Sequence, residues 1–196
     1  MTTRRFEVAI DIEAPGCRLH DPPIAIGVCV ARDGVIIDQR VFCSIVPPEE
    51  DFEPRCLEEF WREKDELLAR IDANALGDTA DMLRAFLNYL GKMVNEQGGA
   101  LPTFISDNPA FDIGAIDRAI ALYLPEEEYG LRHMWPQYCW IEDGSEQKEG
   151  LLPIEIDWVR AQCTVDHDHW PVNDATHHWQ MWNAIKRVKA MRVKSN

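Results

Sequence analysis

The sequence lacks several features that mark particular classes of protein. No segment approaches the roughly 18 consecutive apolar residues of a membrane span, and Met1 to Arg5 lead directly into a β-type segment instead of the apolar core of a signal peptide. The six cysteines form no Cys-x-x-Cys pair and mostly lie in apolar runs, as buried thiols of a reducing compartment do. We therefore expect a cytoplasmic protein that does not associate with membranes.

Positive charge is also scarce. The chain has 20 lysines and arginines against 34 aspartates and glutamates, a net charge of −14. This balance argues against a protein that grips long nucleic acid by releasing counterions. It leaves open a contact with phosphates through a bound cation, which inverts the local electrostatics. A cluster of basic residues lies in the last eleven positions, where cations favour the C-terminal end of a helix.

The 196 residues are enough for one well-filled domain. The sequence shows no internal repeat, low-complexity tract or linker, so we expect residues 1–196 to form a single domain. Three β-type segments come first, at 8–13, 24–31 and 35–46, and Asp33-Gly34 is a hairpin signal between the last two. Strands joined by short turns predict an antiparallel meander.

Helical periodicity and turn residues predict the remaining elements. They are a helix with an apolar stripe from Leu57 to Ile71, a helix opening at the N-cap Asp78, a strand over Leu101–Ser106 followed at once by a helix, a strand at 137–141, a loop at 142–150, a short helix at 154–162 and a last helix at 172–193. Strands and helices in this order predict an α/β fold.

Two carboxylates end the first strand. Asp11 and Glu13 are two positions apart and therefore point to the same face, while Ile10 and Ile12 point to the other. Adjacent like charges repel unless a positive group lies between them. A solvated acidic edge strand would explain this stretch by itself, and a cation site requires further carboxylates.

Two more acidic residues could provide the further carboxylates. Asp112 follows the Leu101–Ser106 strand, at the end where open α/β sheets bind ligands, although helix capping would also explain it. Asp174 opens the last helix, five residues after His169. Hard divalent cations prefer carboxylate oxygens, so the four acidic residues together are candidates for a metal centre.

In this order, the positions resemble the DEDDh class of 3′→5′ exonucleases. Asp11-Ile12-Glu13 resembles the first motif of the class, 108–112 the second, and 169–174 the third. The Ser-Asp-Asn-Pro-Ala-Phe-Asp string and the Phe60-Trp61 helix look most similar to small exoribonucleases and phage-type exonucleases related to oligoribonuclease and RNase T. The resemblance implies an RNase H-like α/β fold, with a central mixed sheet of an antiparallel three-strand meander plus parallel strands, flanked by helices.

The resemblance also implies a mechanism of two-metal hydrolysis. Two Mg²⁺ or Mn²⁺ ions stabilise both the attacking and the leaving oxygen of a phosphodiester. Asp11 would bridge the two ions, Glu13 would touch only the ion that carries the water, and His169 would accept the proton of that water. The residues that the resemblance implies for metal binding are Asp11, Glu13, Asp112 and Asp174.

Substrate contacts follow from the same resemblance. Those near the 3′-terminal nucleotide would be Ala14, Gly16, Asn108, Phe111 and Trp170. Asn108 and Phe111 are expected first to fix and pack the turn. Trp170 is equally consistent with base stacking and with core packing, and Trp61 is placed in the core.

Several alternatives remain at this stage. The expected substrate is the 3′ end of single-stranded RNA or of short oligoribonucleotides, with single-stranded DNA as the alternative. A non-catalytic RNase H-like module and a metal-dependent phosphatase are weaker readings, and a homodimer is possible. A zinc site of Cys163, His167 and His177 fits no familiar spacing. His178 suits either the core or a hydrogen bond to a metal-binding carboxylate.

Overall fold

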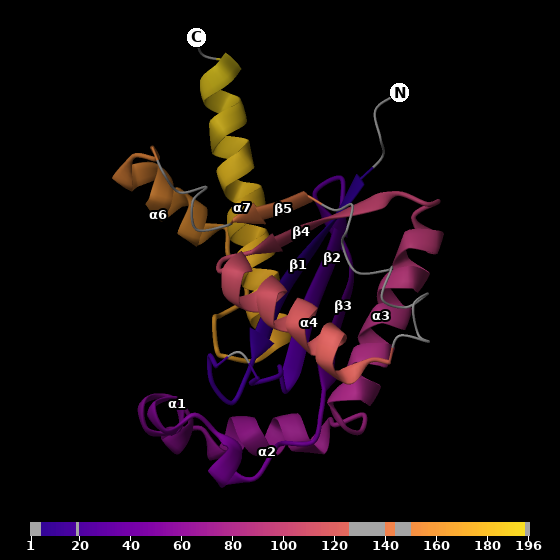
Figure 1. Ribbon diagram of the computed structural model, residues 1–196. Coiled ribbons are helices and arrows are strands. Elements are labelled where there is room, and N and C mark those ends of the chain that lie inside the picture. The colour runs from indigo at the N-terminus through magenta and orange to yellow at the C-terminus, as the bar shows by residue number, and fades with distance from the viewer. Residues whose placement is uncertain (1–4, 19, 126–139, 144–149, 195–196) are drawn as a thin grey trace.

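The central feature of the fold is a five-stranded mixed sheet with strand order β3-β2-β1-β4-β5 (Figure 1). The structure is a computed structural model and describes residues 5–18, 20–125, 140–143 and 150–194. The strands are β1 (Arg5–Glu13), β2 (Ala25–Arg32), β3 (Val35–Cys43), β4 (Leu101–Ser106) and β5 (Trp140–Asp143). β1, β2 and β3 pair antiparallel, while β4 pairs parallel with β1 and β5. The predicted meander with added parallel strands is confirmed.

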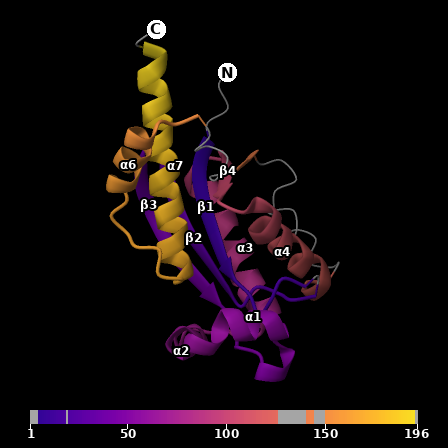
Figure 2. The same cartoon turned by 90° about the vertical axis from the view of Figure 1, so that its left-hand side faces the viewer.

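Helices cover both faces of this sheet. They are α1 (Pro54–Glu59), α2 (Asp65–Ala73), α3 (Thr79–Glu96), α4 (Pro109–Tyr123), α6 (Pro153–Ala161) and α7 (Pro171–Lys194), with the 3₁₀ turns η1 (Glu49–Asp51) and η2 (Trp61–Glu63). Figure 2 shows α3 and α4 on one face and α7 on the other. Among the helices described, none combines the length and the apolar character that a membrane crossing requires.

The alternation of β1 divides the core into two layers. Val8, Ile10 and Ile12 are buried against α3 and α4, whereas Ala9 is buried with Trp179 and Trp182 of α7. Because side chains alternate along a strand, Asp11 and Glu13 continue the face that carries Ala9. The two carboxylates therefore project toward the first turn of α7.

The first turn of α7 lies directly on β2. Gly27 pairs with Asp11 in the sheet register. A Cβ atom at Gly27 would lie 2.0 Å from the carbonyl carbon of Pro171 and 2.4 Å from the amide nitrogen of Val172. Only a residue without a side chain permits this approach, which brings the third motif onto the strand pair that carries the first.

The predicted continuous helix from Leu57 to Ile71 is wrong. The segment is divided into α1, η2 and α2, because Phe60 (φ −125°, ψ −53°) and Lys64 (φ −123°, ψ 33°) leave the helical conformation. Between them, the buried Trp61 indole nitrogen donates a 3.0 Å hydrogen bond to the Ala14 carbonyl. A buried tertiary hydrogen bond and the core contacts of the indole outweigh a helical propensity of a few tenths of a kcal/mol per residue.

Smaller differences concern strand ends. β3 stops at Cys43 instead of continuing to residue 46, and β5 begins at Trp140, while the predicted strand residues 137–139 lie outside the described part of the chain. A loop is predicted at 142–150. Its first two residues belong to β5, and residues 144–149 also lie outside the described part of the chain. The other predicted elements agree with the structure to within a few residues.

Candidate active site

One cleft contains every predicted site residue except Trp170. It has a volume of about 300 Å³ and opens at the carboxyl ends of β1 and β4. We call it the acidic cleft. The predicted residues that line it are Asp11, Glu13, Ala14, Gly16, Asn108, Phe111, Asp112, His169 and Asp174.

The carboxylates of the acidic cleft are close together and buried. Asp11, Glu13 and Asp174 each offer an oxygen atom, and these atoms lie within 4.8 Å of one another. Asp112 and Asp174 are 3% and 1% exposed. Buried carboxylates in such a group are stable in the charged form only when a cation balances them.

The pKa values of these carboxyls are raised, which shows that their charged forms are unfavourable in the cleft. Burial first, and then repulsion by Asp174 and Asp112, raise the pKa of Glu13 to about 8, against the opposing effect of Lys64. Burial raises the pKa of Asp112 to about 7. Burial and neighbouring carboxylates raise the pKa of Asp11 well above its ordinary value, and burial raises that of Asp174. A divalent cation among them would remove this cost.

We predict that the metal-free protein becomes less stable as the pH rises. The unfolded chain releases the protons of these carboxyls near pH 4, whereas the folded protein holds the proton of Glu13 up to about pH 8. Within that window the folded state binds more protons, so each retained proton lowers the free energy of unfolding by about 1.4 kcal/mol per pH unit. Thermal unfolding with a chelator should therefore give a higher melting temperature at about pH 5.5 than at about pH 8.5.

Added Mg²⁺ supplies the control for this prediction. It should raise the melting temperature more at the higher pH, where its carboxylate ligands are ionised and repel one another without the ion, than at the lower pH, where protons compete with the ion for these ligands. A metal-free protein whose stability is constant or increases over the window would contradict the prediction.

Asp112 is oriented by the turn between β4 and α4. The hydroxyl of Ser106 donates to Asp112 Oδ2, and the Asn108 amide donates to the Ser106 oxygen at 3.0 Å. Hydrogen bonds from Ser106 and from the backbone of Asn108 and Ile12 partly oppose the rise in the Asp112 pKa. The backbone amide of residue 108 thus helps to position Asp112 through Ser106, the role of the Asn108 side chain stays a prediction, and Asp112 lines the cleft from the start of α4.

The loop before α7 is held by Asp168. Its carboxylate accepts hydrogen bonds from the Trp170 amide and from Asn173 Nδ2, both at 3.0 Å, and its own amide donates to Asp174 Oδ1 at 3.0 Å. Next to it, His169 has a positive φ of 63°. A non-glycine residue in the left-handed region is uncommon and is retained only where its surroundings determine it.

His169 faces the carboxylates of β1. Its Nδ1 atom lies 4.0 Å from Glu13 Oε1, and its ring meets the Phe60 ring edge-on at a centroid distance of 5.1 Å. Burial, then Lys64 and His167, lower the pKa of His169, so the imidazole is neutral near pH 7. A neutral imidazole beside a carboxylate group can accept a proton.

Sequence reasoning missed two residues at the acidic cleft and left a third undecided. His167 Nε2 lies 3.3 Å from Asp174 Oδ2. His178 stands between Asp11 Oδ1, at 3.9 Å, and Asp107 Oδ2, at 3.4 Å. The only signals were the adjacency of Asp107 to the second motif and of His167 to the third. His178 is buried, as predicted for a core residue, but its 3.9 Å separation from Asp11 is longer than a hydrogen bond, so the predicted hydrogen bond to a metal-binding carboxylate stays a prediction.

The expectation of a base-stacking Trp170 is corrected by the structure. The side chain is 5% exposed and packs with Trp61 and Phe52 in a core cluster. The Arg70 guanidinium covers its ring at 3.7 Å from the centroid. A ring enclosed in this way has no free face for a base. The phenylalanine rings that line the acidic cleft are those of Phe111, a predicted site residue, and Phe60, which periodicity alone had placed in a helix stripe.

The turn after Glu13 is held by contacts with Trp61 and Glu53. Trp61 holds the Ala14 carbonyl, and a Cβ atom at Gly16 would lie 2.4 Å from the Cβ of Glu53. Packing alone therefore accounts for the glycine. The same packing leaves Ala14 and Gly16 lining the acidic cleft.

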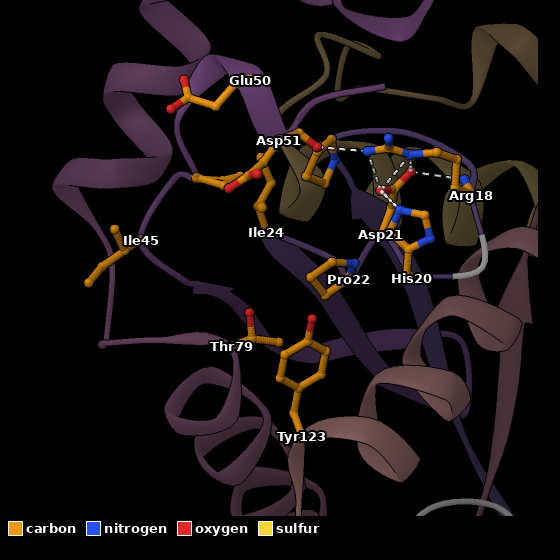
Figure 3. A pocket seen from close by; sticks show the side chains of 12 residues that line it. Arg18, His20, Asp21, Pro22, Ile24, Ile45, Glu50, Asp51, Thr79 and Tyr123 are labelled. Atoms are coloured by element: carbon orange, nitrogen blue, oxygen red, sulfur yellow. Dashed lines mark hydrogen bonds and ion pairs between the residues drawn. The ribbon is translucent and has the colours of Figure 1, made fainter. Parts of the chain in front are cut away.

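A second cavity of about 350 Å³ lies on the other side of this turn (Figure 3). Arg18 is the one lysine or arginine among its described lining residues, and it is engaged by both carboxylate oxygens of Asp21 and by the Asp51 carbonyl. Glu50 adds further negative charge. The carboxylates of this cavity would repel a phosphate, and its arginine is already paired with Asp21. The cavity is therefore not part of the proposed site.

Comparison with known proteins supports the fold. No family model matches the sequence, and no curated protein matches it either. Among solved structures, a zinc-bound form of the E. coli ExoI–ssDNA complex matches with a TM-score of 0.63 at 13% identity, over 95% of this chain and 41% of the other. The nuclease domain of 3′hExo, a DEDDh family member bound to rAMP, matches with a TM-score of 0.53 at 13% identity, over 96% of this chain and 94% of the domain.

The RNase domain of the yeast Pop2 protein matches with a TM-score of 0.56 at 10% identity, over 95% of this chain and 78% of the other. The chain thus spans about two fifths of the exonuclease I structure that it matches. At these identities the likeness establishes the fold, which is the RNase H-like α/β fold of DEDDh exonucleases that the sequence motifs predict.

Proposed function

We propose that this protein is a metal-dependent 3′→5′ exonuclease that removes nucleoside 5′-monophosphates from single-stranded RNA or short oligoribonucleotides. The observation that carries the proposal is the convergence in one cleft of four carboxylates from β1, α4 and α7 and of His169 from the loop before α7. We further propose that residues 1–196 form one exonuclease domain. The neighbours support the nuclease class, since those compared include an ssDNA complex and an RNase domain.

The residues of the acidic cleft suit Mg²⁺ or Mn²⁺. Oxygen donors are the preferred ligands of these ions, and the donor oxygens of Asp11, Glu13 and Asp174 already lie within 4.8 Å of one another. Two such ions would supply positive charge at the attacking and leaving oxygens of the phosphodiester. Asp11 groups with Glu13 and Asp174 and lines the same cleft as Asp112, which suits the bridging role that we propose for it.

The remaining chemistry belongs to the side chains of the cleft. The neutral His169 imidazole accepts the proton of the attacking water, and its partly exposed position, 36% of the side chain, lets it pass that proton to solvent. Ala14, Gly16, Asn108 and Phe111 also line the cleft, and we propose that they contact the terminal nucleotide. An inert RNase H-like module would not need this complete set.

The direct test is a shortening assay on matched substrates. The 5′-labelled single-stranded RNA and DNA of the same sequence are incubated with Mg²⁺, with Mn²⁺ and with a chelator. We expect a metal-dependent ladder of products that shortens from the 3′ end, with RNA consumed faster than DNA. A ladder on DNA alone would establish the alternative substrate, and intact substrate in every metal condition would exclude the function. Hydrolysis of mononucleotides without shortening would identify a phosphatase.

We predict that His169→Ala slows the single-turnover rate about 100- to 1,000-fold, because a positioned general base is removed. The carboxylates remain, so Mg²⁺ should still raise the melting temperature of the variant as it does in the wild type. His20→Ala, at a side chain that is 72% exposed and outside the acidic cleft, is the control and should retain the rate. If His169→Ala is fully active while His167→Ala is not, the base has been assigned to the wrong histidine.

A further inference from the structure

We propose that His167, His169 and Asp174 form a transition-metal site that binds Zn²⁺ or Co²⁺. One ligand atom from each of the three side chains lies within 4.8 Å of the others. Two imidazoles and one carboxylate are a donor set that Zn²⁺ and Co²⁺ prefer and that Mg²⁺ does not. This site differs in its donors from the carboxylate group of Asp11 and Glu13, although the two share Asp174.

The three donors are held in place before any metal arrives. Asp174 Oδ1 is occupied by the Asp168 amide at 3.0 Å, which leaves Oδ2 facing His167 Nε2 at 3.3 Å. The rings of His167 and His169 meet at a centroid distance of 5.2 Å on either side of Asp168. The carboxylate of Asp168 fastens this loop to the first turn of α7, so metal binding requires small rotations of side chains and no refolding of the loop.

The site also has an open side. The side chains of His167 and His169 are 42% and 36% exposed, so solvent can complete a coordination of four. The neighbouring His177, whose Nδ1 hydrogen-bonds with the Val165 carbonyl at 2.8 Å, is not among the side chains whose ligand atoms come together here. Within the described residues, the grouping of Cys163, His167 and His177 does not occur as a metal cluster.

Metal bound at this site would occupy His169 and draw Asp174 away from the carboxylate group. Zn²⁺ should then inhibit a reaction that Mg²⁺ supports. This consequence rests on the proposed exonuclease function, whereas the binding itself does not.

The binding is tested by titrating the protein with Co²⁺ and recording visible absorption. A site with two imidazoles and low coordination number gives an intense band, and six oxygen ligands give a weak one. We expect the intense band in the wild type and its displacement by Zn²⁺. His167→Asn should weaken Co²⁺ binding about tenfold or more. His177→Gln, at the other imidazole next to His167, is the matched control and should bind as the wild type does.

Three further measurements separate the possible outcomes. Thermal unfolding is used to test whether His167→Asn is folded, and Asp11→Asn should keep the intense band because Asp11 is outside the three donors. An unchanged band in His167→Asn, or a band lost in His177→Gln, would overturn the site. In the nuclease assay, half-inhibition of His167→Asn should require about tenfold more Zn²⁺ than the wild type, each relative to its own Mg²⁺ rate. Co²⁺ binding without any nuclease activity would overturn the proposed function and leave the metal site standing.

Discussion

Replacing Asp11 with asparagine should abolish metal-dependent hydrolysis and at the same time stabilise the metal-free protein. Asp11 is the carboxylate whose pKa is raised by burial and by all three of its partners, Asp112, Glu13 and Asp174. In the proposed mechanism Asp11 is the ligand shared by both ions, so its loss should remove several kcal/mol of transition-state stabilisation, or about 10,000-fold in rate. At about pH 8, however, the carboxyl of Asp11 must either remain charged beside its neighbours or hold a proton against the solution, and the amide avoids both costs.

The measurement pairs a single-turnover rate with a melting temperature. We expect the chelator-treated variant to melt about 2–4 °C higher than the wild type, which corresponds to roughly 1 kcal/mol for a chain of this length. Mg²⁺ should no longer raise the melting temperature by the wild-type amount. Asp33→Asn is the control, since Asp33 is exposed and its φ of 53° is a conformation that asparagine tolerates. A variant that is active, or one that melts below the wild type, would contradict the four-carboxylate site.

The second large effect is expected at Gly27→Ala, although Gly27 is no part of the proposed chemistry. The added Cβ atom would lie 2.0 Å from the carbonyl carbon of Pro171 and 2.1 Å from its oxygen. These are backbone atoms, so the start of α7 must move away from β2. We expect the free energy of unfolding to fall by about 3 kcal/mol. The rate should fall about 100-fold, because His169 and Asp174 flank Pro171 and move with it.

Gly114→Ala is the matched control for this substitution. Gly114 lies within α4, where the added Cβ would meet only the flexible end of Arg118 at 3.2 Å. Alanine is the better helix former there, so the variant should be unchanged or more stable by up to about 1 kcal/mol. Chemical denaturation gives the two stabilities, and rates are measured where both variants are folded. Wild-type stability and activity in Gly27→Ala would show that the first turn of α7 does not need its contact with β2.

Short-range patterns in the sequence are sufficient to predict much of this fold. The two-residue period of β1 places Ile10 and Ile12 in one core layer and the two carboxylates of the first motif toward α7. The Leu101–Ser106 strand, the turn after it and the helix start bring Asp112 to the same end of the sheet. These features depend on residues near one another in sequence, so periodicity and turn chemistry are sufficient to predict them.

The tertiary structure decided the features that join distant segments. The indole of Trp61 reaches the Ala14 carbonyl across 47 positions and breaks a helix that periodicity predicts as continuous. Arg70 covers Trp170 and removes it from the site.

The contact between the third motif and the strands near the first motif also depends on the tertiary structure. The sequence around Gly27 is that of an ordinary strand. Only the structure shows that a side chain at this position would collide with the backbone of Pro171. His167 joins the acidic cleft because the loop held by Asp168 turns it toward Asp174. The residue types of the site could be predicted from sequence, since its chemistry selects them. Which side chains touch is set by packing between segments far apart in the chain, and that packing leaves no local pattern.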